Sequence, residues 1–209
     1  MGQIIDKAII NTAKNLANSL DNVTDIALPQ DISDIVKLHA KIAAGLAVIP
    51  IPGGDTIAAV GNIWTMYVRM NDKLGLKLSS SAIKTIASGV AGNLGGVVAG
   101  YLAGGMVAKF LPGLGSIAGA VIDAAVLYSL TLTSAYVYMK ALIALAERDG
   151  KDFSDIDIET HLSDAINNIL SEDKDDINVV MKDARKSFKK EDMKDAVKLA
   201  KEAREEDKA

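Results

Sequence analysis

The chain has 209 residues, which suits one large domain or one domain with an appended region. A net charge of -4 and a pI of about 5.2 argue against a broad nucleic-acid surface. The absence of cysteine excludes disulfides and thiolate metal sites. Hydrophobic residues make up 49% of the chain but aromatic residues only 4%, so the apolar side chains are mostly small and aliphatic and suit close helix packing.

Charge is divided unevenly along the chain. Residues 1–110 carry nine Lys/Arg and seven Asp/Glu, whereas residues 111–209 carry fourteen and twenty. We therefore expect an N-terminal amphipathic helix and loop at 1–34, an apolar glycine-rich helical core at 35–148, and an acidic, amphipathic helical region at 149–209. No segment alternates apolar and polar residues with a period of two, so the predicted fold class is an all-α multi-helix bundle.

The first half of the chain predicts three helices before its glycine-rich segment. Apolar residues at helical spacing indicate an amphipathic helix over 3–20 and a second helix that begins at Asp31 or Ser33. Proline removes a backbone donor and glycine frees a turn, so the segment after Ile49 predicts a helix break. The residues of this break are Pro50, Pro52 and Gly53. Asp55 is the expected N-cap of the third helix, which should end near Gly75.

The segment 85–108 holds 24 residues without a formal charge and has a four-residue repeat of glycine. The repeat consists of Gly92, Gly96, Gly100 and Gly104. Residues four apart share one face of a helix, so this helix-packing stripe would let another helix approach closely. A second break follows at Pro112, Gly113 and Gly115. We expect the stripe to receive the helix predicted over 116–147, and only secondarily to contact another molecule.

The charged region after Gly150 predicts two or three amphipathic helices, because apolar residues continue at helical spacing. The last of these is expected to be mostly a solvated, charged rod.

Two properties of the glycine-rich hairpin, its length and its charge, bear on membrane insertion. A helix of 24 residues is about 36 Å long, against a hydrocarbon core of about 30 Å. Its eight large aliphatic residues favour insertion by only a few kcal/mol, and Asp123 on the following helix costs about 2.5–3.5 kcal/mol. A docked or inserted hairpin with both ends cytoplasmic is therefore favoured over independent spans. A bundle with the glycine helix buried in its own core is the alternative.

Few residues suggest chemistry. Asp123 and Asn93 form a possible buried polar site, which would either respond to an ion, partner or pH, or serve as a hydrogen bond within the bundle. His39 and His161 are the only histidines, and we expect each to be a surface or boundary residue rather than a ligand or a base. The Gly113-x-Gly115 pattern lacks the preceding strand that a dinucleotide site requires. We predict no catalytic residue, no bound cofactor and no metal site, and hence no enzyme.

The break Pro50-Ile51-Pro52-Gly53-Gly54-Asp55 and the later Phe110–Ser116 segment, at this separation, resemble the YcjF-like domain of unknown function. The resemblance covers about residues 35–147. Members of that family are helical, glycine-rich bacterial domains that often follow a small GTPase domain, and this sequence contains no such GTPase domain. The resemblance implies a membrane-associated helical fold and supplies no catalytic residues.

These observations lead to one main functional hypothesis and two alternatives. The main hypothesis is a non-enzymatic scaffold or GTPase-accessory protein at the bacterial cytoplasmic membrane, held there peripherally or by insertion of the hairpin 85–147. Its expected partners are the membrane, a protein such as a separately encoded GTPase, and a second copy of the chain, but no nucleic acid. The alternatives are a soluble helical interaction or regulatory module and a pore-forming or membrane-perturbing effector.

Overall fold

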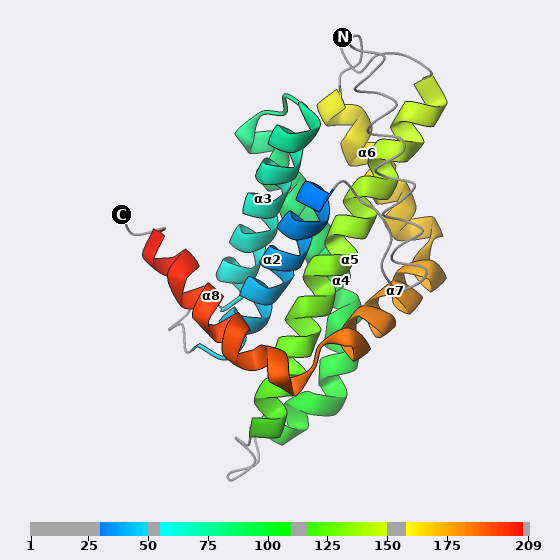
Figure 1. Ribbon diagram of the computed structural model, residues 1–209. Coiled ribbons are helices and arrows are strands. Elements are labelled where there is room, and N and C mark those ends of the chain that lie inside the picture. Colours follow the sequence, from blue (N-terminus) through cyan, green and yellow to red (C-terminus); the bar gives the residue numbers. More distant parts are fainter. Residues whose placement is uncertain (1–29, 50–54, 110–116, 150–157, 207–209) are drawn as a thin grey trace.

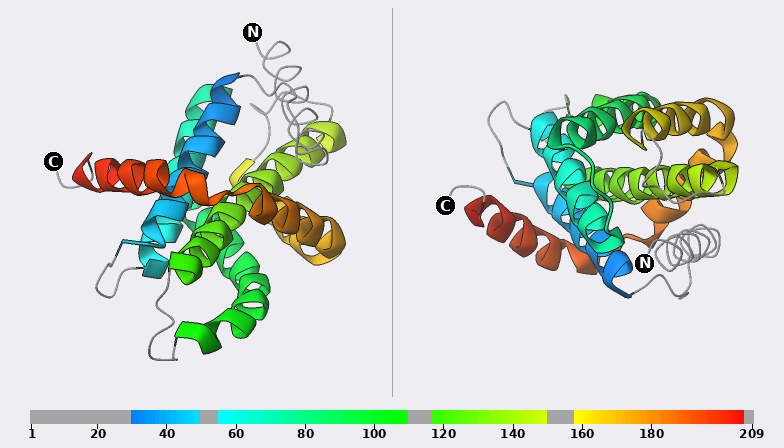
Figure 2. Two further views of the ribbon diagram at one scale, coloured as in Figure 1. Left: turned by 60° about the horizontal axis from the view of Figure 1, so that its bottom comes forward. Right: turned by 90° about the horizontal axis from the view of Figure 1, so that it is seen from above.

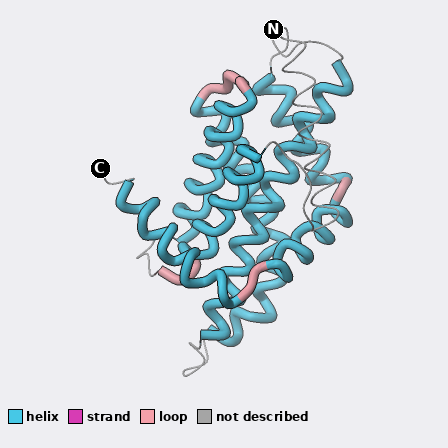
Figure 3. Tube along the Cα trace, in the orientation of Figure 1, coloured by secondary structure: helices cyan, strands magenta, loops and turns pink. Residues whose placement is uncertain are grey.

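The computed structural model describes residues 30–49, 55–109, 117–149 and 158–206. This part of the chain forms α-helices, one short 3₁₀ helix and their connections, and it contains no strand (Figure 3). The all-α prediction is therefore confirmed. The helices are α2 (Gln30–Leu46), α3 (Asp55–Leu74), α4 (Ser80–Lys109), α5 (Ile117–Asp149), α6 (Ile158–Glu172), α7 (Lys174–Ser187), η2 (Lys190–Asp192) and α8 (Met193–Glu206). The helix predicted over 3–20 lies outside the described residues.

Helix α5 is the centre of the bundle and contacts α2, α3, α4, α6 and α7 (Figure 1). Helices α2 and α3 lie side by side on one side of α5, and α6 and α7 lie on the other (Figure 2). One hydrophobic cluster runs from Ile32 on α2 to Ala184 on α7. The charged C-terminal region thus shares its core with the apolar region that precedes it.

The polar residues of α5 explain how this helix can lie in the core. Ser129, Thr131, Thr133 and Ser134 are buried, and each hydroxyl donates a hydrogen bond to a backbone carbonyl three or four residues earlier. This internal pairing meets the need that a buried hydroxyl has for a partner. A helix whose polar groups are satisfied internally can face neighbours on every side.

Helix α3 confirms the predicted boundaries at both ends. It begins at Asp55 and ends at Leu74, and Gly75 then adopts a φ of 70°. The Leu76 N–H donates to the Asn71 carbonyl at 2.9 Å, and the Gly75 N–H donates to the Asp72 carbonyl at 3.4 Å. This pair of bonds is a Schellman motif, which needs a left-handed residue that glycine adopts without strain.

Helix α8 is mostly solvated, as predicted, but one face of it packs on α2. Ala196 and Ala200, four residues apart on one face of α8, are completely buried against α2. A Cβ added at Gly45 of α2 would lie 2.7 Å from the Cβ of Ala200 and still closer to the Ala196 carbonyl oxygen. Gly45 is therefore the position at which two helices approach too closely for any larger residue.

The outer side of the α2–α8 contact is polar. The Lys41 ammonium lies 2.8 Å from the Asp195 carboxylate, and the hydrogen bond from Lys41 holds the pKa of Asp195 below its ordinary value. Both side chains are largely exposed, so this ion pair adds little to stability. The close contact at Gly45, with the apolar side chains around it, fixes α8 in place.

Candidate functional site

The α4–α5 hairpin extends beyond the rest of the bundle at the end opposite the α3–α4 turn (Figure 1). The far ends of both helices lie past the α7–α8 connection, and only the C-terminal part of the uncharged segment 85–108 belongs to this arm, because its first part is packed in the core. Near the start of α5, the Ile122 side chain is 55% exposed. Among the residues whose side chains are described, only Val179 on α7, at 58%, is a comparably exposed large hydrophobic residue.

The structure does not place another helix against the first glycine of the predicted stripe. Gly92 is exposed, and a Cβ built on it would meet no heavy atom within 4 Å. The expectation that the stripe receives the helix over 116–147 is therefore wrong at Gly92, because that part of α4 turns its glycines away from α5. The backbones of Gly96, Gly100 and Gly104 belong to α4, but their surroundings lie outside the described residues.

The predicted buried pair of Asn93 and Asp123 is also corrected. Asn93 is exposed, and its amide donates a hydrogen bond of 2.9 Å to the Gly89 carbonyl on the same helix. Asp123 is half-buried near the start of α5 and has a partner of its own. The two residues therefore do not form a shared buried site. Since α4 faces solvent at Asn93, its amide needs no partner from α5.

The family-like breaks fall mostly outside the described residues. Asp55 is the first residue of α3, which agrees with the predicted start of that helix. The remaining residues of the two breaks, which are not described, are Pro50, Pro52, Gly53, Pro112, Gly113 and Gly115.

His39 is the main residue that the sequence reading misplaced, because it is 2% exposed rather than at the surface. Its Nδ1 lies 2.9 Å from the Asn62 side-chain oxygen, and the Asn62 amide donates to the His39 carbonyl at 2.9 Å. The Asn62 oxygen can only accept, so Nδ1 carries the proton and Nε2 is a bare acceptor. That Nε2 is buried and has no partner within the described structure.

Burial lowers the pKa of His39 below its ordinary value of 6.5, and the charge of Arg69 acts in the same direction. The hydrogen bond with Asn62 opposes this shift only in part. His39 is therefore neutral near pH 7. His161, the other histidine, is half-buried on α6 and has a partner there.

A second buried polar cluster joins α3 to α5. The rings of Tyr67 and Tyr138 stack with centroids 4.2 Å apart. The Tyr67 hydroxyl donates to the Ser134 carbonyl at 2.9 Å, and the Tyr138 hydroxyl donates to the Asn71 side-chain oxygen at 2.5 Å. Burial raises the pKa of both phenols, so both are neutral. Donating hydroxyls held in this way are structural partners rather than acids or nucleophiles.

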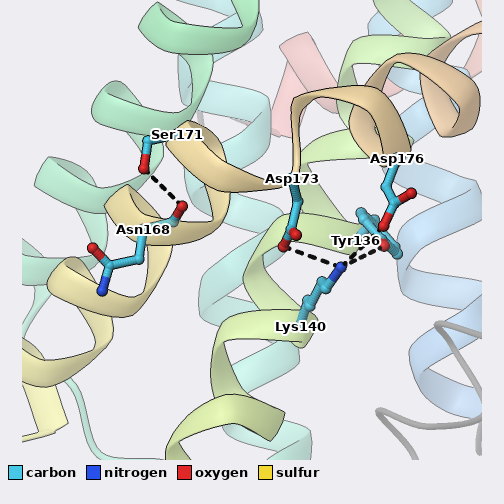
Figure 4. A network of polar contacts seen from close by, with 6 residues as sticks. All are labelled: Tyr136, Lys140, Asn168, Ser171, Asp173 and Asp176. Carbon is cyan, nitrogen blue, oxygen red and sulfur yellow. Dashed lines mark hydrogen bonds and ion pairs between the residues drawn. The ribbon is translucent and has the colours of Figure 1, made fainter.

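Lys140 links α5 to the junction of α6 and α7 (Figure 4). Its ammonium lies 3.1 Å from the Asp173 carboxylate and 3.6 Å from that of Asp176, and it donates to the Tyr136 hydroxyl at 3.2 Å. Burial alone would lower the pKa of Lys140, but the bonds with Tyr136 and Asp173 outweigh it and raise the pKa. Lys140 is therefore charged, and its role is to hold the start of α7 against α5.

One described helix segment, Ala120–Leu145 of α5, is long and apolar enough to cross a membrane. Of its most apolar window, 61% is buried inside the bundle, as is typical of a core helix. The described residues bring together no group of three or more His, Asp or Glu side chains that could hold a metal ion. The only buried histidine among them, His39, faces an amide rather than a hydroxyl nucleophile.

Comparison with known proteins identifies no relative: no family model, no curated protein and no solved structure matches the chain.

Proposed function

We propose that the chain is a non-enzymatic helical protein that docks on a membrane through the end of its α4–α5 hairpin, without spanning the bilayer. The observation that carries the proposal is the extension of the end of this hairpin, whose only formal charges between 85 and 139 are Lys109 and Asp123, beyond the rest of the bundle (Figure 1). An arm that projects past its neighbours can enter the headgroup region while the rest of the fold stays intact.

Docking accounts for the hairpin better than spanning does. To cross a bilayer, α5 would have to give up its contacts with α2, α3, α6 and α7, which bury most of its length. Shallow insertion of the arm needs no such separation. It also places the exposed Ile122 in an apolar environment, and full burial of an isoleucine side chain is worth about 1.5–3 kcal/mol.

The partner on the membrane is a separate question. The resemblance to the YcjF-like domain favours an accessory role beside a separately encoded GTPase, and this role stays a proposal that rests on the two proline-glycine breaks. Bound to a membrane by its arm, the bundle would present the α6–α8 surface to the cytoplasm. That surface carries most of the exposed charge of the C-terminal region.

Flotation of the full chain with lipid vesicles tests docking, and the two exposed hydrophobic residues supply a matched pair of variants. Ile122→Glu places a carboxylate near the end of the arm, whereas Val179→Glu makes the same change on α7 at equal exposure. We expect Ile122→Glu to lower vesicle binding by about tenfold or more, because it exchanges a gain of about 1.5–3 kcal/mol for a desolvation cost. Val179→Glu should bind as the wild type does.

Two outcomes would contradict the proposal. An equal loss of vesicle binding in both variants would indicate a general effect of charge. If the wild type did not bind vesicles, membrane docking would be refuted. Release of an entrapped dye at the same protein loading would instead favour the membrane-perturbing alternative, since docking of a single arm leaves the vesicle closed.

A further inference from the structure

A groove lies between α2, α3 and the C-terminal half of α8, away from the α4–α5 arm, and it encloses about 460 Å³. Helix α8 packs closely on α2 at Gly45, and its C-terminal end points away from the bundle (Figure 1). Its apolar lining comes from all three helices and comprises Leu38, Ile42, Leu46, Ala58, Leu199 and Ala203. A cavity of about 150 Å³ holds a benzene molecule, so this groove has room for a ligand several times larger.

Two residues that line the groove each carry a buried polar atom without a partner. His39 and Trp64 both line it, and neither the Nε2 of His39 nor the Nε1 of Trp64 has a hydrogen-bond partner within the described structure. The first is an acceptor, since Nδ1 of His39 holds the proton, and the second is a donor. Buried polar atoms in native proteins nearly always have a partner, so the groove lacks a donor for one and an acceptor for the other.

The charges at the groove indicate a neutral ligand. Arg69 and Arg204 line it together with Glu202 and Glu206, so two positive and two negative side chains are balanced. A carboxylate ligand would be attracted by the two arginines and repelled by the two glutamates, and for an ammonium ligand the signs are reversed. A hydroxyl group both accepts and donates, and so can accept from the indole N–H and donate to the imidazole nitrogen together.

We propose that the α2–α3–α8 groove binds a neutral amphipathic molecule, with an aliphatic body on the apolar lining and a hydroxyl group at His39 and Trp64. Helix α8 then has a second role beyond closing the bundle, because Leu199 and Ala203 form one wall of the site. Binding would hold α8 against α3 and would stabilise the C-terminal helix. This site is independent of membrane docking, since the groove and the arm are formed by different segments.

The full chain in vesicle-free buffer, with n-decanol as the probe, tests this site. Trp64 is the only tryptophan in the chain, so its fluorescence reports occupancy of the groove directly. We expect a saturable change in Trp64 emission and a rise in the unfolding temperature with n-decanol. The n-decyl methyl ether, which lacks a donor, should bind about tenfold more weakly, as the loss of one buried hydrogen bond predicts. Decanoate should bind more weakly than the alcohol.

A pair of variants on α8 locates the binding. Ala203→Phe fills the groove and should abolish the response to n-decanol, whereas Lys201→Phe places the same ring on the exposed face of the helix and should leave it unchanged. Circular dichroism of both variants verifies that α8 still folds. No saturable response of the wild type, equal binding of alcohol and ether, tighter binding of decanoate, or an unchanged response in Ala203→Phe would each overturn the proposal.

Discussion

Replacement of Gly45 by alanine is expected to destabilise the protein, against the usual behaviour of this substitution in a helix. Alanine is the better helix former by about 1 kcal/mol, so Gly→Ala at an open position adds stability. At Gly45 the new methyl group would meet the Ala196 carbonyl oxygen and the Cβ of Ala200, 2.7 Å away. Neither atom can rotate aside, because one belongs to the backbone and the other to the shortest side chain.

The magnitude follows from the opposition of these two effects. Overpacking of a close contact costs about 1–3 kcal/mol, and the gain in helix propensity returns at most about 1 kcal/mol. We therefore expect Gly45→Ala to lower the free energy of unfolding by about 1–2 kcal/mol. Gly92→Ala is the matched control, because a Cβ there meets nothing within 4 Å, and it should raise that free energy by about 0.5–1 kcal/mol.

Urea unfolding followed by circular dichroism measures the free energy of unfolding of both variants. Hydrogen exchange of the α8 amides shows which helix is destabilised. In Gly45→Ala the α8 amides should exchange faster than those of α5, because α8 must move away from α2 to make room. If Gly45→Ala were as stabilising as Gly92→Ala, the close approach of α8 to α2 would be refuted.

Three further predictions concern buried or paired polar groups. The free energy of unfolding should fall as pH decreases through about 6.5, because His39 binds a proton in the unfolded chain but stays neutral in the folded one. His39→Gln should flatten this part of the curve of stability against pH. An unchanged slope would contradict the lowered pKa of His39 in the folded protein. Tyr138→Phe should cost about 1–3 kcal/mol in urea unfolding, because it leaves the Asn71 oxygen buried without a donor; a neutral effect would argue against that bond. Lys140→Met should cost about 1 kcal/mol or less, and the difference should shrink in high salt if the ion pair with Asp173 is its cause.

The helix boundaries could be predicted because their signals are local. Asp55 is the first residue of α3, and Gly75 ends the helix through a Schellman motif that depends on a few neighbouring residues. The choice of contacting glycine could not be predicted in the same way. Gly92 belongs to the more regular pattern, yet Gly45 rather than Gly92 makes a close contact, and its partner Ala196 lies 151 positions later in the chain.

The buried polar groups escaped prediction for a related reason. His39 lies beside apolar residues on α2, but its burial depends on Asn62 of α3, which supplies the hydrogen bonds that make an interior histidine acceptable. Similarly, Ala196 and Ala200 belong to the apolar face that the spacing predicts for α8, but their contact with Gly45 of α2 could not be predicted from that spacing. Distant pairs of this kind leave no periodic signal in a single sequence, so the groove they border could not be inferred from it.

Docking of the α4–α5 arm is the central claim, and site-specific fluorescence tests it most directly. The chain has no cysteine, so Ile122→Cys and Val179→Cys each give one site for an environment-sensitive NBD label. On addition of lipid vesicles, the label at position 122 should shift to shorter wavelength and brighten as it enters an apolar environment. The label at position 179 should not change. A response at position 179 equal to that at 122, or no response at either position, would contradict docking through the arm.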